Sequence, residues 1–292
     1  MTETFLHDFA IENNIAFENT LVGYVKEVIL LSLGEKGYGR SLWLKNKSAL
    51  SRKGYARRVN RSLTFVYKED ERVLKSDGFV PGCAYDADFL MNLFETEIKS
   101  IPEFQVKNPE VSETTLSFDL YYKEMYVPFS LEILPLKEEN LTPNQEVITL
   151  PICGRALEVL TYPMEQEAAH HVVKLCKELE LINEMEHYLE AYKLFAENSL
   201  EGVRLQNAIA LELEKAKLSY DRDDLSRVLA FRDYGYMKKK WKVLLRRQKL
   251  ESPAWEDVID LLDKVLSPIW QAGKEDVIFF GDWMPEIGRY LD

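Results

Sequence analysis

The chain has 292 residues, of which 46% are hydrophobic, 12% aromatic and 29% charged, a composition typical of a folded globular protein rather than a disordered one. Its 37 Lys and Arg residues are outnumbered by 49 Asp and Glu residues, and the resulting charge of −12 argues against a broadly basic nucleic-acid coat protein. A chain of this length is expected to form two domains.

The cysteines and the amino terminus indicate a soluble cytoplasmic protein. Cys83, Cys153 and Cys176 are odd in number and far apart, so the sequence predicts neither a disulfide framework nor a metal-binding cysteine pair. The first residues lack the basic and apolar regions of a signal peptide, and the apolar run at 28–33 is too short to span a bilayer. We therefore expect no membrane partner.

The first half of the chain alternates between helical and strand patterns. Apolar spacing predicts an amphipathic helix over 20–33, then strands within 41–50 and 61–69. A second helix is expected over 88–101, capped by Asp86 or Asp88, which explains this Asp-x-Asp pair without a metal. Residues 115–122 and 127–136 are expected to pair as a hairpin.

From Met164 onward the pattern is that of amphipathic helices, over 164–184, 187–198, 203–218, 224–248 and 253–270. Trp241, Trp255 and Trp270 are expected to pack between these helices. The sequence thus predicts an α+β protein with two domains. Residues 1–162 form a mixed sheet with flanking helices, and residues 163–292 form a helical bundle.

Positive charge is concentrated in two segments that contain no acidic residue. Residues 36–61 hold nine Lys and Arg residues, and residues 238–249 hold seven. Such clusters suit phosphate groups, although a solvated helix face with acidic partners elsewhere is an equal alternative for the second cluster. A local anion site is therefore compatible with the acidic average.

The first basic segment resembles part of a known family. The stretch LWLKNKSAL followed by RRVNRSLTFVY resembles the AbiEii/AbiGii toxin-type nucleotidyltransferases, whose pattern is a strand, Gly-Gly-Thr/Ser-Ala-Leu, an Arg-x-Ser segment and Asp-x-Asp on the next strand. The resemblance implies that Asn46, Lys47, Ser48 and Arg58 line a nucleotide-binding turn. It implies a nucleotidyltransferase-like fold for the first domain.

This chain differs from the family at the residues that hold the metal. Asn46 and Lys47 stand where the family has two glycines, and Ser62 and Thr64 stand where it has the aspartate pair. Magnesium prefers carboxylate and phosphate oxygens, so uncharged hydroxyls are poor replacements. We therefore expect metal-dependent transfer to be impaired or absent.

The resemblance continues along almost the whole chain. Glu132, in VPFSLEILPL, occupies the place of a third carboxylate and is the expected metal ligand. LTYPMEQEAAHHVV resembles a helix in which His171 replaces a functional lysine, and HYLEAYKL resembles another in which Glu190 keeps the last acid of an Arg-Asp-x-x-Asp-Leu motif. The resemblance implies catalytic roles for Ser62, Thr64, Glu132, His171 and Glu190.

Other metal chemistry is not expected. His170 and His171 are adjacent and point to different faces of a helix, and His187 is remote from them in sequence, so no histidine has the spacing of a zinc site. Packing roles for the histidines are the simpler interpretation.

Three functions follow. The first is a degenerate nucleotidyltransferase that keeps an anion- or nucleotide-binding cleft or a partner surface and needs no cofactor. The second is an active toxin, which would use Mg²⁺ and a nucleoside triphosphate, modify RNA or protein and have a cognate antitoxin, as the resemblance implies. The third is an interaction scaffold. We favour the first because charged metal ligands are missing.

Overall fold

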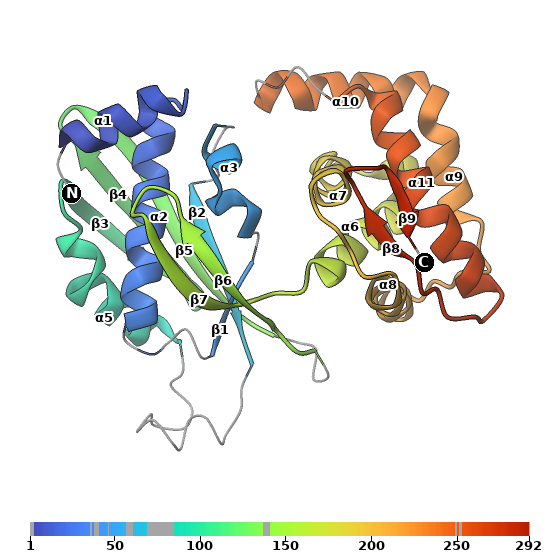
Figure 1. Cartoon of the computed structure of the whole chain (residues 1–292), viewed down its shortest axis with the longest axis horizontal. Helices are drawn as coiled ribbons and strands as arrows, with labels where there is room; N and C mark the ends of the chain where they lie inside the picture. The colour runs from blue at the N-terminus through green and yellow to red at the C-terminus, as the bar shows by residue number, and fades with distance from the viewer. Residues whose placement is uncertain are drawn as a thin grey trace. The chain divides into compact units, whose positions relative to one another are not determined.

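The computed structural model of the chain describes residues 3–35, 37, 41–45, 47–56, 61–68, 85–136, 141–248, 250 and 253–291. The chain divides into two compact units, Met1–Tyr162 and Pro163–Asp292 (Figure 1). The division falls where strand patterns give way to helical ones in the sequence. The first unit combines a sheet with helices and the second is mainly helical, so the α+β class predicted from the sequence is confirmed.

The first unit is built on a mixed sheet of seven strands in the order β3-β4-β5-β2-β1-β7-β6. Two neighbouring pairs, β2 with β5 and β1 with β7, are parallel, and the other neighbours are antiparallel. The β4–β5 hairpin is the one expected from the sequence. The strands are β1 (Leu42–Leu44), β2 (Ser62–Tyr67), β3 (Gln105–Val111), β4 (Thr115–Tyr122), β5 (Met125–Pro135), β6 (Asn144–Leu150) and β7 (Arg155–Thr161).

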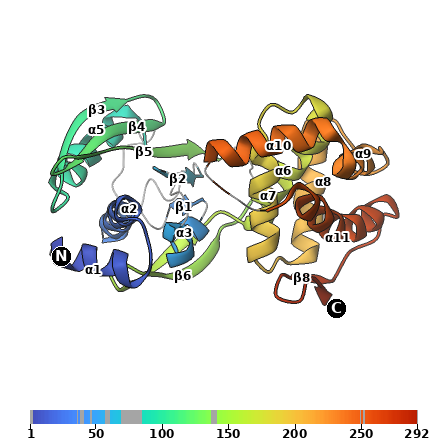
Figure 2. The ribbon, with the colours of Figure 1, turned by 90° about the horizontal axis from the view of Figure 1, so that it is seen from above.

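Helices bury one face of this sheet, which curves around α2 (Figure 2). The predicted helix at 20–33 is confirmed as α2, and Asp86 caps α5 by accepting a hydrogen bond from the Phe89 amide at 3.0 Å. The helices are α1 (Glu3–Glu12), α2 (Phe17–Glu35), η2 (Lys47–Leu50), α3 (Arg52–Ala56), α5 (Ala87–Thr96) and η3 (Ile98–Ser100). Side chains from α1, α2, η2, α3 and α5 join the strands in one core.

Strand alternation sends the other side chains to the opposite face. On β2, Leu63 and Phe65 lie in the core, so Thr64 between them and Ser62 before them point away from the helices. On β5, Leu131 and Ile133 lie in the core, and Ser130 and Glu132 point to the same opposite face. The second face of the sheet is therefore polar where these two strands adjoin.

The second unit is a helical bundle with a small hairpin. Its elements are α6 (Met164–Glu178), η4 (Leu179–Leu181), α7 (Glu186–Glu197), α8 (Gly202–Ala216), α9 (Asp224–Ala230), η5 (Phe231–Asp233), α10 (Gly235–Gln248), α11 (Trp255–Lys274), β8 (Asp282–Met284) and β9 (Arg289–Leu291). Trp241, Trp255 and Trp270 are buried, as expected, and each donates its indole N–H to a backbone carbonyl. The hairpin β8–β9 was not expected from the sequence.

The structure also bears on the cysteines and on the helices that were considered as membrane spans. Cys153 and Cys176 are free, whereas Cys83 lies outside the described residues. No helix in the described part of the chain is both long and apolar enough to cross a membrane.

Candidate functional site

The parallel strands β2 and β5 bring three of the expected site residues to one place. Register pairs Ser62 with Ser130 and Thr64 with Glu132. The Thr64 hydroxyl donates a hydrogen bond to Glu132 Oε2 at 3.1 Å. Both residues are half-buried on the polar face of the sheet. The hydroxyls of Ser62 and Thr64 on β2 and the carboxylate of Glu132, which is far from them in the sequence, therefore lie together on one face of the sheet.

These residues do not supply the ligands that a magnesium ion prefers. Glu132 is the one carboxylate in this group, and Thr64, its neighbour across the strands, offers it a hydroxyl donor. Magnesium is normally held by one or two carboxylates together with phosphate oxygens and water. Within the described residues, no three His, Cys, Asp or Glu side chains are arranged to hold a metal ion. The donor set therefore does not fit the two-metal chemistry of an active nucleotidyltransferase.

The segment after β1 carries two cations at the same end of the sheet. The Lys45 amide donates to the Thr64 carbonyl at 2.9 Å, and its ammonium lies 4.9 Å from the centre of the Tyr162 ring. The Lys47 ammonium is ion-paired with Glu146 on β6, and Glu146 also accepts the Thr161 hydroxyl at 2.8 Å. Lys47 is therefore already neutralised by a carboxylate.

The rest of the expected nucleotide-binding turn is described only in part. The backbone of Ser48 lies in η2, but its side chain is outside what the structure describes. Asn46 and Arg58 also lie outside the described residues. The expectation that these residues bind a nucleotide therefore stays a prediction.

A buried carboxylate anchors the helix that follows this turn. Glu27 on α2 accepts the Tyr55 hydroxyl at 3.0 Å and the Cys153 amide at 2.6 Å, and both of its oxygens lie 3.1 Å from the Ile152 amide. Burial raises the pKa of Glu27, while these hydrogen bonds oppose that rise by favouring the charged form. Burial also raises the pKa of the Cys153 thiol to about 12. Glu27 thus ties α2, α3 and the β6–β7 turn together.

A hollow of about 570 Å³ lies on the polar face next to Ser130, the strand partner of Ser62. Asp119 on β4 accepts the Asn108 amide at 2.8 Å and the Tyr126 hydroxyl at 3.0 Å, and this hydrogen bond raises the pKa of Tyr126. Asn108 has a left-handed backbone (φ 54°) at a bulge in β3, which directs its side chain to Asp119. The polar lining is Arg61, Asn108, Glu110, Ser117, Asp119, Tyr126 and Ser130.

The other two expected catalytic residues lie together in the second unit. His171 on α6 and Glu190 on α7 line a hollow of about 360 Å³. Nδ1 of His171 is 2.8 Å from Nδ1 of His187, and Nε2 of His187 is 3.1 Å from Glu184. Glu190 accepts a hydrogen bond from Lys193 at 2.7 Å.

His187 is remote from His171 in the sequence, but the two rings are in contact in the structure. The sequence places the two on different helices, and the packing of α6 against α7 brings their rings into contact. Burial lowers the pKa of His187, and Glu184 opposes this effect. A helix-hairpin contact of this kind has no local sequence signal.

The chain is similar to solved structures of nucleotidyltransferase-like proteins at low sequence identity. No family model and no curated protein matches the sequence. A solved structure similar to the chain is that of a candidate nucleotidyltransferase from H. pylori, at 12% identity over 91% of this chain and 100% of that chain, with a TM-score of 0.49. Another is an antigenic nucleotidyltransferase-like protein from Paracoccidioides brasiliensis, at 15% identity over 70% and 91% of the two chains, with a TM-score of 0.38. At these scores neither similarity establishes a shared family or activity.

Proposed function

We propose that the first unit is a degenerate nucleotidyltransferase-like domain, which keeps a nucleotide- or anion-binding role and has lost efficient metal-dependent transfer. The observation that carries this proposal is the pairing of Thr64 with Glu132 on the parallel strands β2 and β5. The family that the sequence resembles has carboxylates on both strands at this point, whereas this chain has one carboxylate and one hydroxyl. On this proposal, the two strands keep one carboxylate of a former metal site, Glu132, and lack the carboxylates on β2.

The chemical consequence is large. A bound metal ion would stabilise charge on the phosphoryl oxygens, and losing its charged ligands removes several kcal/mol of that stabilisation. Each loss of about 1.4 kcal/mol slows a reaction tenfold. A Thr64 hydroxyl that donates to Glu132 adds no negative charge for a cation. Nucleotidyl transfer is therefore expected to be slower by orders of magnitude than in an enzyme that keeps these carboxylates.

Binding of a triphosphate requires fewer precisely placed ligands than metal-dependent transfer does. Lys47, the first residue of η2, is the described cation of the expected nucleotide-binding turn, and Lys45 lies two residues before it. Lysine ammonium groups bind phosphate as point charges without a fixed metal geometry. Lys47 must exchange its pairing with Glu146 for the phosphate, so weak binding is expected.

The first experiment measures transfer directly. The full chain is incubated with each labelled nucleoside triphosphate and Mg²⁺ or Mn²⁺, with itself, RNA or copurified protein as acceptor. We expect label incorporation at background. Robust turnover that is lost in Glu132→Gln would contradict the proposal and favour the active toxin with an RNA or protein target.

The second experiment restores the missing charges. Ser62→Asp with Thr64→Asp places two carboxylates beside Glu132, and this variant is expected to bind Mg²⁺ in titration calorimetry where the parent protein does not. Ser62→Asn with Thr64→Asn is the matched neutral control. Failure of the aspartate variant to bind Mg²⁺, with a folded circular-dichroism spectrum, would show that β2 and β5 are not a metal scaffold.

A third measurement separates binding from a scaffold role. Lys45→Ala with Lys47→Ala is expected to weaken binding of a nucleoside triphosphate about tenfold, on the order of 1.4 kcal/mol. If the parent protein binds no triphosphate at all, the first unit is better explained as an interaction scaffold. The expectation of an antitoxin partner rests on the family resemblance alone. A protein that does not transfer nucleotides would not need an antitoxin to inhibit it.

A further inference from the structure

Helix α10 concentrates positive charge on a protein that is acidic as a whole. Its sequence, GYMKKKWKVLLRRQ, contains six Lys and Arg residues and no acidic residue, whereas the chain carries −12. Met237, Trp241 and Leu244 bury the opposite side of the helix in the bundle. The charge therefore gathers on the flanks and on the outer face of one well-packed helix.

The basic residues on the flanks of α10 are used within the bundle. Lys238 donates to Glu256 at 2.6 Å, and Arg247 is ion-paired with Glu186. Lys240 donates to the Ile182 carbonyl and lies 4.9 Å from the centre of the Tyr236 ring. These three cations hold α10 to its neighbours and are neutralised or hydrogen-bonded there.

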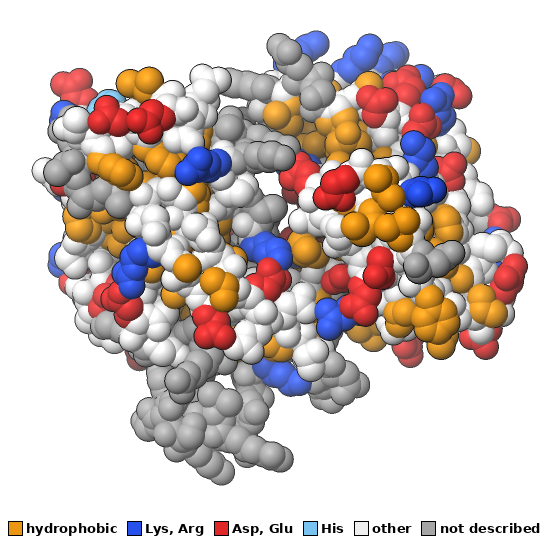
Figure 3. Space-filling view, viewed as in Figure 1, with side chains coloured by type: hydrophobic (Ala, Val, Ile, Leu, Met, Phe, Trp, Pro, Cys, Tyr) orange, Lys and Arg blue, Asp and Glu red, His pale blue; other side chains and the backbone are white. Residues whose placement is uncertain are grey.

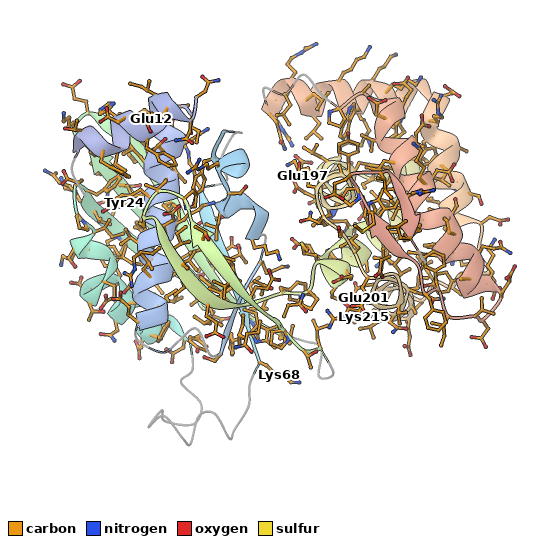
Figure 4. All side chains as sticks on the ribbon, in the orientation of Figure 1. Glu12, Tyr24, Lys68, Glu197, Glu201 and Lys215 are labelled. Carbon is orange, nitrogen blue, oxygen red and sulfur yellow. The ribbon has the colours of Figure 1, made fainter. Side chains whose placement is uncertain are left out.

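The basic residues on the outer face are not used in this way. Lys239, Lys242 and Arg246 are exposed, and in the part of the chain that the structure describes they make no ion pair or hydrogen bond. Successive helical residues are about 100° apart, so these three cations and Tyr236 fall within an arc of about 120°. Figure 4 shows nitrogen-tipped side chains that project from α10 away from the bundle, and Figure 3 shows blue groups along the same edge.

Exposed aromatic rings lie at the start of the same face. Tyr234 and Tyr236 are 45% and 49% exposed, and their ring centres are 6.0 Å apart. From Tyr236 to Arg246 the face extends about 15 Å, at about 1.5 Å per residue. Tyrosine rings can stack on unpaired bases, while neighbouring lysines and arginines neutralise the phosphates of the same strand.

We propose that the outer face of α10, formed by Tyr236, Lys239, Lys242 and Arg246, together with Tyr234 just before the helix, binds single-stranded nucleic acid. The unpaired cations supply charge complementarity to the phosphodiester backbone, and the tyrosines favour a strand with accessible bases over a duplex. An anionic membrane offers the same charge but no bases to stack. The surface is independent of the Thr64–Glu132 pair and of whether the first unit binds a nucleotide.

The test uses the full chain and fluorescently labelled 12-nucleotide oligo(U) and oligo(dT) in anisotropy titrations. Lys239→Ala/Lys242→Ala/Arg246→Ala is expected to weaken binding about tenfold or more at low salt, because a contact with three phosphates gives a log–log salt slope of about −2. Tyr236→Ala is expected to weaken binding about fivefold. The salt slope should fall in the triple variant and stay unchanged in Tyr236→Ala.

The matched control removes the same charge elsewhere in the second unit. Lys177, Lys264 and Arg289 are exposed and likewise make no ion pair or hydrogen bond among the described residues. Lys177→Ala/Lys264→Ala/Arg289→Ala is expected to keep the parent affinity within about twofold, since it leaves the α10 contacts intact. An equal loss in both triple variants would overturn the proposal, because binding would then depend on the total positive charge of the protein and not on the position of that charge on α10.

Three further outcomes also overturn the proposal. They are the absence of oligonucleotide binding by the parent protein, binding to a 12-base-pair duplex as tight as to the single strands, and binding to vesicles of phosphatidylserine and phosphatidylcholine without binding to oligonucleotides. Melting curves of all variants establish that they remain folded, since every substituted side chain is exposed.

Discussion

His171 and His187 share one short contact, with 2.8 Å between their Nδ1 atoms. One ring must donate and the other accept, so the contact requires at least one neutral imidazole. Lys174 and His170 add positive charge nearby and Glu184 adds negative charge. We therefore expect the second unit to lose stability in acid.

The sign of this sensitivity follows from His187. Its pKa is lowered from the ordinary value of 6.5, chiefly by burial, so the unfolded chain binds more protons. Stability contributed by neutral His187 is present above pH 6.5 and is lost as the pH falls through its folded-state pKa. We expect the melting temperature of the parent protein to fall more between pH 7.5 and 5.5 than that of His187→Gln, measured by tryptophan fluorescence.

Glu184→Gln provides the second arm of this test. Glu184 raises the pKa of His187, so removing its charge lowers that pKa further and should increase the loss of stability in acid. Four of the five tryptophans follow Pro163 in the sequence, so fluorescence reports mainly on the second unit. Parallel melting curves for the parent protein and His187→Gln would show that the pair does not titrate in this range.

Residues that share a strand pattern or a motif could be predicted from the sequence, and residues joined by long-range packing could not. Strands β2 and β5 and the helix cap at Asp86 have local signals in the form of alternation and an N-cap residue. The contact of Thr64 with Glu132 depends on strand order, which only the family resemblance suggested. His187 beside His171 depends on helix packing and had no such guide.

Other elements were missed for physical reasons that the structure shows. Strand β3 is an edge strand that contains Pro109 and a bulge, so its exposed residues break the alternation that marks a strand. Asp119 lacks a motif, and its importance in the hollow comes from Asn108 and Tyr126 on neighbouring strands. The edge strand β3 and the side-chain partners on neighbouring strands therefore could not be predicted from the sequence of this unit.

Tyr55→Phe is expected to destabilise the first unit by about 1.5–3 kcal/mol, the usual worth of a hydrogen bond to a charged group. The Tyr55 hydroxyl donates to Glu27, which is fully buried, so its loss leaves that carboxylate less compensated. Urea unfolding and hydrogen exchange of peptides from α2 and α3 would measure the effect. Tyr126→Phe, which removes an exposed bond to Asp119, should cost less than about 0.5 kcal/mol.

Two glycines that begin helices should respond in opposite ways to alanine. A Cβ at Gly202, the first residue of α8, would lie 2.0 Å from the Gly281 carbonyl oxygen, so Gly202→Ala must move the backbone. We expect it to cost about 2 kcal/mol or more. A Cβ at Gly235, the first residue of α10, meets nothing within 4 Å, so Gly235→Ala should stabilise by about 0.4–1 kcal/mol. Thermal unfolding of both variants measures the contrast, and equal shifts would contradict it.

Glu146→Gln should strengthen triphosphate binding by the first unit, because Glu146 holds the Lys47 ammonium in an ion pair that the phosphate must displace. Both side chains are partly exposed, so the gain is expected to be modest, about threefold to tenfold at low salt. Lys47→Ala should weaken binding, and Lys47→Ala with Glu146→Gln should match Lys47→Ala alone, because the carboxylate acts through that lysine. Titration calorimetry with a nucleoside triphosphate measures all three variants. Glu146→Gln could instead strengthen binding equally with and without Lys47. The effect would then come from the change in net charge, and it would show that Lys47 does not contact the phosphate.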